Sequence, residues 1–186
     1  MQIKKEMIHF RRVRLDDLSQ IYDWLTNDPE VKRFWGYAHQ GPYEEVTREF
    51  ERYVNGDEPT EPYLILYGET SIGYIQTFQW IDYPEYEQYV DLSHAASIDL
   101  FIGLSEFRNK GLGSSIISRF LRDYVFADPS VVRCVINPEV SNSAAIRVYE
   151  KVGYRIIKTV QDISGEPGPV HFMSIERDPF ISNNDE

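Results

Sequence analysis

The sequence predicts an α/β fold of one domain, in which a mixed sheet is covered by helices. Its 186 residues, 42% of them hydrophobic and 26% charged, fit one compact globular core. Segments with apolar residues at helical spacing alternate with short apolar runs typical of strands. No repeat, linker or change of composition divides the chain, so we expect one domain over residues 1–177 and a tail at 178–186.

The first elements are expected to be a strand and two helices. Residues 8–12 alternate as in a strand and lead into a helix at 16–26. The Asn-Asp-Pro-Glu turn at 27–30 is expected to stop this helix, and 31–41 to form a short aromatic connection. A second helix is expected at 42–55, because proline is tolerated in a first helical turn.

The pattern then changes to the period of strands, and later alternates again. The remaining expected elements are a hairpin of strands at 63–67 and 71–80, a strand at 96–103, a helix at 111–126, a strand at 131–136, a helix at 142–151, and strands at 154–160 and 170–176. The last residues, 181–186, are expected to be frayed.

The charge balance restricts the partners. The chain has 30 acidic and 19 basic residues, a formal net charge of −11, so it repels nucleic acid and anionic membranes and attracts a cationic ligand. No stretch is apolar and long enough for a signal peptide or a membrane span. We therefore expect a cytoplasmic protein with a small cationic ligand.

Disulfides and metal ions are not expected. Cys134 is the only cysteine, which excludes an intramolecular disulfide and a thiolate zinc cluster and fits a reducing compartment. The four histidines lie far apart and show neither HxxxH nor HExxH spacing. We therefore expect chemistry without a metal.

The stretch LFIGLSEFRNKGLGSS at 100–115 has the pattern of an anion-binding turn. An apolar strand ends, a polar turn carries Arg108, Gly111 and Gly113, and a helix begins. Glycines let backbone N–H groups approach a ligand, and the helix N-terminus adds partial positive charge, so a pyrophosphate fits here. The alternative is that the glycines serve only the turn. The spacing is neither that of a Walker A loop nor GxGxxG.

Two motifs in combination resemble a known superfamily. RNKGLG at 108–113 followed by NSAAIRVYEKVGY at 142–154 resembles the Gcn5-related N-acetyltransferase (GNAT) superfamily, with its acetyl-CoA loop and its later helix NxxAxxxYxxxG(F/Y). More narrowly, four segments resemble the aminoglycoside 6'-N-acetyltransferases: RFWGYAHQGP near residue 35, EPYLILYGETSIGYIQTF at 61–78, SIDLFIG at 97–103 and INPEVSNSAAIRVYEKVGY at 136–154. The resemblance extends to about residue 176.

The resemblance implies a GNAT fold with a splayed pair of central strands, and direct attack of an amine on the thioester of acetyl-CoA. No nucleophilic side chain is required, so Cys134 is expected to be inert and buried. The residues that the resemblance assigns to acetyl-CoA are Leu100, Phe101, Ile102, Arg108, Asn109, Lys110, Gly111, Leu112, Gly113, Ser114, Asn142 and Tyr149.

Asp99 is the expected acid-base residue. It interrupts an apolar strand, where a carboxylate is costly unless it is solvated, paired or used. From the pattern alone, a place on the solvent face of the sheet, alternating with Ile98 and Leu100, is equally consistent. The resemblance assigns to Asp99 contact with the reacting amine and the role of general base, with water sharing in proton removal.

Tyr149 and Asn142 are expected on one helix. They lie seven residues apart, near two turns, so both can face one cleft. The motif assigns Tyr149 the proton for the departing thiolate, although most of the 13 tyrosines serve packing. Asn142 could bind the cofactor, cap the helix or do both.

The segment WIDYPEYEQYVD at 80–91 interleaves rings with carboxylates. This composition suits an aminosugar, because rings attract cations and carboxylates pair with ammonium groups; the alternative is a solvated loop. In the similar enzymes the aromatic segment near residue 35 helps to enclose the drug, although a core position for its tryptophan is also open. The candidate acceptor-binding residues are Trp35, Tyr37, Asp82, Glu85, Asp99 and Asn137. The similar enzymes usually have aspartate at the position of Asn137, so this chain keeps hydrogen bonding there but lacks the charge.

The leading interpretation is a metal-free enzyme that transfers acetyl from acetyl-CoA to the 6'-amine of aminoglycoside antibiotics and confers resistance. An acetyltransferase for another small amine, such as a siderophore lysine derivative or a polyamine, is an alternative. A noncatalytic acyl-CoA-binding module is a third interpretation; it would keep 108–113 without needing Asp99 or Tyr149. We expect a monomer or a homodimer, without nucleic acid or membrane partners.

Overall fold

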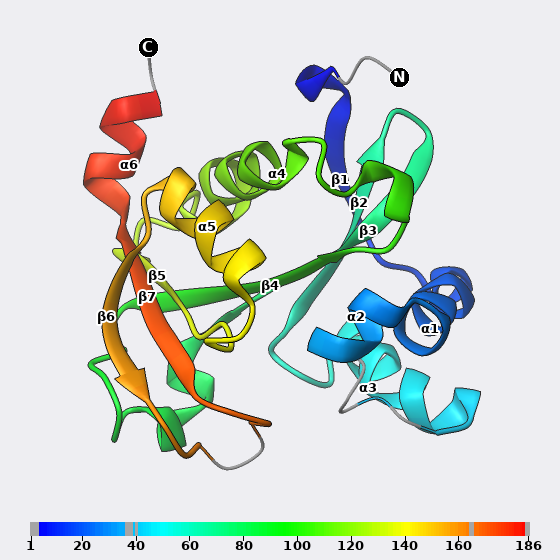
Figure 1. Cartoon of the computed structure of the whole chain (residues 1–186), viewed down its shortest axis with the longest axis horizontal. Helices are drawn as coiled ribbons and strands as arrows, with labels where there is room; N and C mark the ends of the chain where they lie inside the picture. The colour runs from blue at the N-terminus through cyan, green and yellow to red at the C-terminus, as the bar shows by residue number, and fades with distance from the viewer. Residues whose placement is uncertain (1–3, 36–38, 40, 164–165, 185–186) are drawn as a thin grey trace. The chain divides into compact units, whose positions relative to one another are not determined.

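A computed structural model describes residues 4–35, 39, 41–163 and 166–184, and over these residues the chain alternates strands and helices, as predicted. The strands are β1 (Ile8–Arg12), β2 (Glu61–Tyr67), β3 (Thr70–Gln79), β4 (Ala95–Ile102), β5 (Arg133–Ile136), β6 (Arg155–Val160) and β7 (Val170–Glu176). The helices, labelled with the strands in Figure 1, are α1 (Leu18–Asn27), α2 (Pro29–Phe34), α3 (Tyr43–Asn55), α4 (Leu112–Phe120), α5 (Ser143–Val152) and α6 (Arg177–Asn184). In this described part of the chain, no helix has the length and hydropathy needed to cross a membrane.

The strands follow the order β1-β2-β3-β4-β5-β7-β6. β2 is antiparallel to β1 and β3, with Tyr63 opposite both Arg12 and Ile75. β4 and β5 are parallel, whereas β7 is antiparallel to β5 and β6. The sheet is therefore mixed, which confirms the expected fold class.

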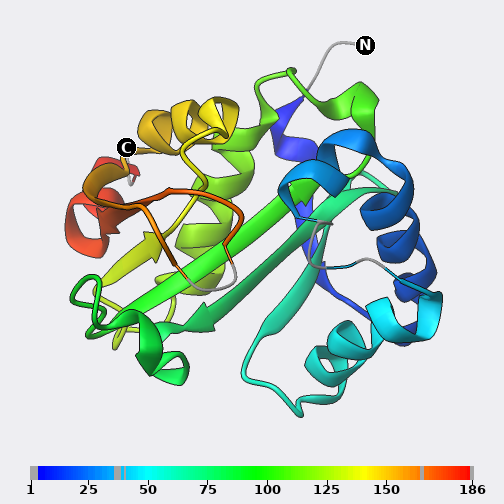
Figure 2. The same ribbon diagram turned by 60° about the horizontal axis from the view of Figure 1, so that its bottom comes forward.

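The chain forms two compact units, and β3 and β4 give residues to both. The first unit is Met1–Thr77 with Asp99–Leu112, and the second is Phe78–Ile98 with Gly113–Glu186. In the first unit, α1, α2 and α3 lie together beside the strands (Figure 2). Its core joins helix and strand side chains: Leu18, Ile21 and Leu25 of α1, Val31 of α2, Phe50 of α3, Leu64 of β2 and Tyr74 of β3.

Helix α2 occupies part of the segment expected to be a turn and an aromatic connection, so that expectation is wrong for Pro29–Phe34. The carboxylate Oδ1 of Asp28 accepts hydrogen bonds from the N–H groups of Glu30, at 3.1 Å, and Val31, at 3.0 Å. Proline at the first helical position needs no N–H partner and has a suitable φ. The same residues that stop α1 therefore start α2.

The core of the second unit includes buried side chains of Trp80, Leu92, Val135 and Phe172. The indole N–H of Trp80 donates to the carbonyl of Val135 at 2.8 Å, which satisfies a buried polar group. α4 continues into a π-helical segment, Leu121–Val125, where the pattern predicts one uninterrupted helix. α6 is helical as far as Asn184, so the expectation of a frayed end is wrong for residues 181–184.

β4 and β5 pair over a short distance. Among the described residues their parallel partners are Ala95 with Arg133 and Ala96 with Cys134, while β4 continues to Ile102. This arrangement is the splayed strand pair that the resemblance implies. Cys134 is fully buried on β5, as expected.

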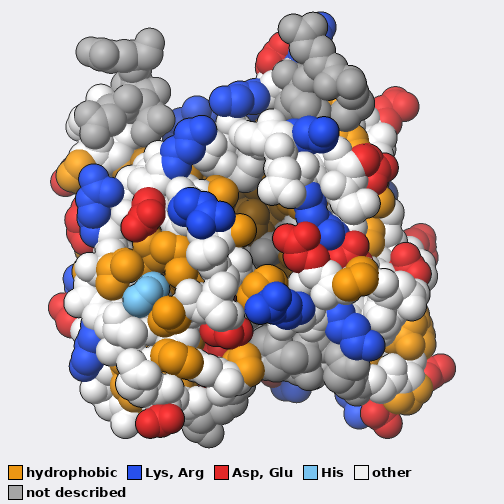
Figure 3. Space-filling model, viewed as in Figure 1, with side chains coloured by type: hydrophobic (Ala, Val, Ile, Leu, Met, Phe, Trp, Pro, Cys, Tyr) orange, Lys and Arg blue, Asp and Glu red, His pale blue; other side chains and the backbone are white. Residues whose placement is uncertain are grey.

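β6 is an edge strand with mostly exposed side chains. Ile156 and Ile157 are 44% and 50% exposed, and Figure 3 shows hydrophobic side chains at the surface over β6 and β7. The register shifts between Ile156 and Lys158. Such an irregularity makes an edge a poorer template for a further strand.

Candidate active site

Asp99 is half-buried in β4 and is hydrogen-bonded through its carboxylate. Its Oδ2 accepts from Nε2 of Gln76 at 3.1 Å, and Oε1 of Gln76 accepts from the hydroxyl of Tyr74 at 2.8 Å. Gln76 is 8% exposed and Tyr74 is fully buried. The Asp99 carboxylate is therefore partly accessible and is held in place by the buried amide of Gln76. Its position is more closely defined than that of a strand side chain that points into solvent.

An aromatic cluster lies beside this polar group in the first unit. The ring of Trp35 packs edge-on against Tyr74, at 5.6 Å between centroids, and against Phe101, at 5.1 Å. Trp35 is only partly buried against this core, so its place fits both a packing role and an acceptor-facing role. Tyr37, the other expected residue of this segment, lies outside the described residues.

The guanidinium of Arg108 is occupied within the first unit. Its Nε donates to the carbonyl of Ile102 at 2.8 Å, and Nη2 donates to the carbonyl of Gly103 at 3.0 Å. The same group forms ion pairs with Asp28, at 2.7 Å, and Glu30, at 3.3 Å. Arg108 thus joins the start of α2 to the end of β4.

The ion pair with Arg108 affects the acidity of Asp28. Burial by itself raises the pKa of this carboxyl group, but the hydrogen bond from Arg108, those from the N–H groups of Val31 and Glu30, and the charge of Arg108 outweigh burial. The pKa of Asp28 therefore lies below its usual value. The carboxylate is charged at neutral pH and serves as helix cap and ion-pair partner together.

The turn after Arg108 presents its backbone to solvent. Asn109 and Gly111 are left-handed, with φ of 55° and 75°, and Asn109, Lys110 and Gly111 are exposed. A Cβ atom at Gly111 would meet no atom within 4 Å, so glycine is favoured there by backbone conformation and leaves open space. At the start of α4, the N–H groups of the first turn lack a carbonyl four residues earlier in the helix.

The second unit carries Gly113, which permits close packing of α4. A Cβ atom at Gly113 would lie 3.0 Å from a methyl group of Val148 on α5. Asn142 caps α5, because its Oδ1 accepts from the N–H of Ala145 at 3.2 Å. Tyr149, two turns later, is 8% exposed, and its ring lies 5.5 Å from that of Tyr154.

The segment 80–91 contains two short 3₁₀ helices, Trp80–Asp82 and Pro84–Tyr86. Its rings pack inward: Trp80 lies 5.0 Å from Tyr86 between centroids, and Tyr89 is stacked on Phe172 at 6.2 Å. Asp82 and Glu85 are exposed. Trp80 therefore belongs to the core and the tyrosines pack against it, while the carboxylates are available to a cation.

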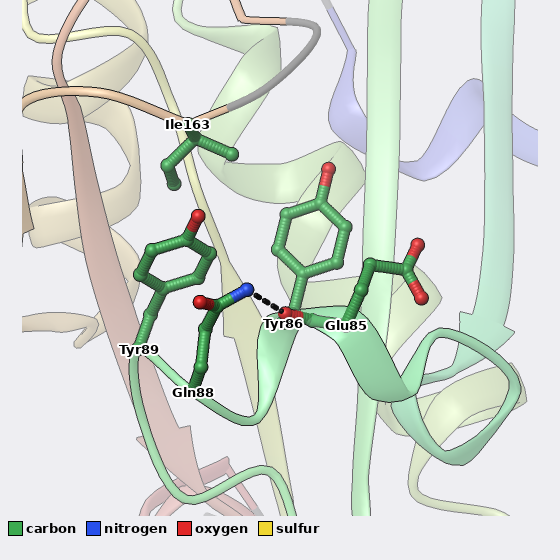
Figure 4. A pocket seen from close by; sticks show the side chains of 5 residues that line it. All are labelled: Glu85, Tyr86, Gln88, Tyr89 and Ile163. Carbon is green, nitrogen blue, oxygen red and sulfur yellow. Dashed lines mark hydrogen bonds between the residues drawn. The ribbon is translucent and has the colours of Figure 1, made fainter.

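A small pocket of about 240 Å³ opens beside this segment and is lined by Glu85, Tyr86, Gln88, Tyr89 and Ile163. Figure 4 shows the hydroxyls of Tyr86 and Tyr89 pointing the same way, while the carboxylate of Glu85 points away from them. Gln88 is held by a hydrogen bond from its Nε2 to the carbonyl of Glu85 at 2.7 Å. The pocket is smaller than those that hold drug-sized ligands, about 300–1,000 Å³.

Asn137 has a carboxylate beside it. Its Nδ2 donates to Oε1 of Glu166 at 3.2 Å. The negative charge that the sequence lacks at position 137 is therefore supplied next to it by a residue from the GEPGP turn. The turn pattern gave Glu166 no chemical role.

Gln76 in the first unit and Glu166 in the second are hydrogen-bonded polar residues that the sequence analysis did not single out. A signal for Gln76 was available, since it is a polar residue within the apolar strand segment 72–78 and such residues need a partner. For Glu166 the sequence offers no comparable signal. In the described residues there is no group of three or more His, Cys, Asp and Glu side chains suited to a metal ion.

The structure groups the expected site residues by unit. Asp99 to Leu112 and Trp35 belong to the first unit, and Asp82, Glu85, Gly113, Ser114, Asn137, Asn142 and Tyr149 belong to the second. Leu100 and Ile102 are half-buried and Phe101 is 9% exposed.

Comparisons with known proteins identify the family of this chain. Residues 14–162 match the acetyltransferase (GNAT) domain family. The aminoglycoside N(6')-acetyltransferase type 1 of Klebsiella pneumoniae is 28% identical over 178 residues, covering 94% of this chain and 86% of that protein. A kanamycin resistance protein of Rhizobium radiobacter is 35% identical over 83 residues, 45% of this chain and 73% of that protein.

Solved structures of aminoglycoside acetyltransferases are also similar to this chain. The aminoglycoside acetyltransferase AAC(6')-Ib in complex with coenzyme A and kanamycin has a TM-score of 0.81 and 26% identity, and the match covers 96% of this chain and 99% of that one. The complex of the same enzyme with ribostamycin and coenzyme A has a TM-score of 0.82 and 27% identity, covering 95% of this chain and 97% of that one. Since the family match extends over most of the sequence, the chain belongs to the acetyltransferase (GNAT) domain family.

Proposed function

We propose that this chain transfers the acetyl group of acetyl-CoA to the 6'-amine of aminoglycosides and so confers resistance to them. Its family supports acetyl transfer, and similarity to aminoglycoside acetyltransferases along nearly the whole chain supports the acceptor. The observation that carries the proposal is the anchored, half-buried carboxylate of Asp99 in β4. A carboxylate in that setting is suited to take a proton from an amine.

The turn at 108–113 is the proposed site for the pyrophosphate of acetyl-CoA. Because the Arg108 side chain is occupied by Ile102, Gly103 and Asp28, we assign phosphate binding to backbone N–H groups of the turn and of the first residues of α4. The exposed left-handed residues Asn109 and Gly111 and the open space at Gly111 fit an anion at this place. Asn142 and the β4 backbone at 100–102 are the further proposed contacts.

Acetyl-CoA supplies an acetyl group activated as a thioester. In the proposed reaction the neutral 6'-amine attacks the thioester carbonyl, and Asp99 removes the amine proton directly or through water. The N–H groups of β4 at 100–102 stabilise the developing oxyanion. Tyr149 provides a proton or hydrogen bond to the leaving thiolate.

Carboxylates of the second unit favour a polycationic substrate. Asp82 and Glu85 are exposed, and Glu166 lies against Asn137. Carboxylates pair with ammonium groups and raise the local concentration of cations. We place the reaction in the cytoplasm, because a single cysteine fits a reducing compartment, and we expect a monomer or a homodimer.

A parallel turnover assay tests the proposal. Release of coenzyme A would be measured with kanamycin, its 6'-hydroxyl analogue, spermidine and N-hydroxylysine. We expect acetylation of kanamycin at a kcat/KM at least about tenfold above that of the two small amines. Brisk turnover of a small amine with none of kanamycin would assign another amine as substrate. Binding of acetyl-CoA without turnover of any amine would indicate a noncatalytic module.

A further inference from the structure

Three polar side chains form a hydrogen-bonded series on β3 and β4. The hydroxyl of Tyr74 donates to Oε1 of Gln76 at 2.8 Å, and Nε2 of Gln76 donates to Oδ2 of Asp99 at 3.1 Å. Tyr74 and Gln76 point to the same face of β3, because side chains two residues apart in a strand do so. Tyr74 and Gln76 are both buried, so water competes little for the hydrogen bonds of the Gln76 amide.

The direction of this series follows from the chemistry of its groups. An ionised carboxylate only accepts hydrogen bonds, so the NH₂ end of Gln76 faces Asp99 and its carbonyl end faces Tyr74. Burial, followed by interactions with Tyr53, Glu49 and Asp99, raises the pKa of Tyr74 well above its usual value. The phenol therefore stays protonated and donates. Each link in this direction favours the charged form of Asp99.

The far end of the series is fixed by packing. The ring of Tyr74 contacts three other rings: Trp35 at 5.6 Å, Phe50 at 5.5 Å and Phe101 at 5.7 Å between centroids. A ring packed on several sides keeps its hydroxyl in one place. That hydroxyl sets the orientation of the Gln76 amide, and the amide sets the position of the Asp99 carboxylate.

We propose that Gln76 is a positioning residue for acetyl transfer, which holds Asp99 as an anion in the orientation needed for proton removal, and that Tyr74 fixes the Gln76 amide. This inference rests on the proposed role of Asp99 as general base. It makes Gln76 act through Asp99 and not through substrate or cofactor.

The first arm of the test compares kcat with KM. The Gln76→Met variant keeps the length of the side chain and removes both of its hydrogen bonds. We expect kcat to fall about 10- to 100-fold, because misplacement of a reacting group by about 1 Å has effects of that size. KM for acetyl-CoA should stay within about twofold. Tyr74→Phe should lower kcat less, since the amide keeps its bond to Asp99.

Tyr63→Phe is the matched control. Tyr63 is 6% exposed on the neighbouring strand β2, and its hydroxyl donates to a carboxylate, Oε2 of Glu61, at 2.9 Å. The variant also loses one hydrogen bond donated by a mostly buried tyrosine hydroxyl, here to a carboxylate instead of an amide, outside the proposed site. An equal loss of kcat in Tyr63→Phe and Tyr74→Phe would contradict the proposal.

A double-mutant cycle separates positioning from general destabilisation. In an Asp99→Asn background, Gln76→Met should lower kcat by less than about twofold, because the group that it positions is no longer a base. If the two losses multiply, Gln76 does not act through Asp99 and the proposal fails.

The last arm does not depend on the substrate. The side-chain amide signals of Gln76 in a ¹H–¹⁵N spectrum should move on Asp99→Asn and on Tyr74→Phe but not on Tyr63→Phe; unchanged signals would overturn the hydrogen-bonded series. If wild type acetylates a different amine, the kinetic arms use that amine, so the proposed acceptor fails while the role of Gln76 is still tested. If no amine is acetylated, both the proposed function and the catalytic role of Gln76 are rejected.

Discussion

Carboxylates assigned to the acceptor occupy two different settings. Asp99 lies half-buried in β4 and is tied to a buried amide, whereas Asp82 and Glu85 are exposed on 3₁₀ helices whose rings pack inward. An anchored carboxylate has a defined position, and an exposed one contributes mainly charge. The first setting suits proton transfer, and the second suits attraction of a cation. Residue type alone does not distinguish them.

The largest expected effect is that of Asp99→Asn. This change keeps the shape and removes the base, so kcat should fall about 10²- to 10⁴-fold, the range of general-base contributions. The dissociation constant of acetyl-CoA, measured by calorimetry, should be unchanged. Asp82→Asn, the matched change on the exposed segment, should leave kcat near that of wild type. Near-normal rates for Asp99→Asn across pH would place proton removal elsewhere.

Arg108→Met tests whether a mostly buried ion pair stabilises the fold more than an exposed one. Its side chain is 13% exposed and that of its partner Asp28 is 16% exposed, so the change leaves a mostly buried carboxylate without its cation. We expect a loss of about 3 kcal/mol in the free energy of unfolding, measured with urea.

The control for Arg108→Met is Arg12→Met. Arg12 pairs with Glu61 at 2.6 Å in the same unit, and the two side chains are 52% and 50% exposed. Its replacement should lower the free energy of unfolding by only about 1 kcal/mol, because exposed pairs contribute less. Equal losses would show that burial of the Arg108 pair has no special weight.

Asp82→Asn and Glu85→Gln test the exposed setting. Each should raise KM for kanamycin about 1.4- to fivefold at low ionic strength, since an exposed ion pair contributes about 0.2–1 kcal/mol, while kcat stays unchanged. The increase in KM should shrink at high salt, because exposed charges are screened. An effect on kcat, or one that salt does not change, would assign these residues a contact inside the reacting complex.

The smallest expected effect concerns Asp91, which is exposed but anchored. Hydrogen bonds from the backbone and side chain of Ser93, and then from Arg133, lower the pKa of Asp91 to about 2. Because this carboxyl group is more acidic in the folded than in the unfolded chain, its contribution to stability is present above about pH 4 and is lost as pH falls toward 2.

Asp91→Asn should therefore lower the melting temperature at pH 6 by a small amount, and the difference from wild type should vanish near pH 2. Thermal unfolding of both proteins at several pH values makes this comparison. A difference that is constant with pH would show that the carboxylate has no such role.

Most elements could be predicted because their signals are local. The four apolar residues of α1 recur at helical spacing, and β2 and β3 join at a glycine turn, so neither depends on distant residues. α2 was missed because its six residues are too few to show a period. The Asp28-Pro29 pair is as typical of the end of one helix as of the start of the next.

The site could be predicted only as residue types. Gln76 and Asp99 are 23 residues apart, and Asn137 and Glu166 are 29 apart, so their contacts depend on strand register and topology. Arg108 also shows that the residue type predicted from sequence does not reveal the partner of that residue. The motif indicates a positive charge for a phosphate, but in the fold that charge is paired with Asp28 and Glu30.

The most direct test of the account is the product formed from kanamycin and acetyl-CoA by the wild-type protein, identified by mass spectrometry and by two-dimensional NMR. We predict a single new acetyl group on the 6'-nitrogen, and its loss when the same reaction is run with Asp99→Asn. An acetyl group on another amine, an undiminished yield with Asp99→Asn, or unmodified kanamycin under conditions in which spermidine is acetylated would contradict the account.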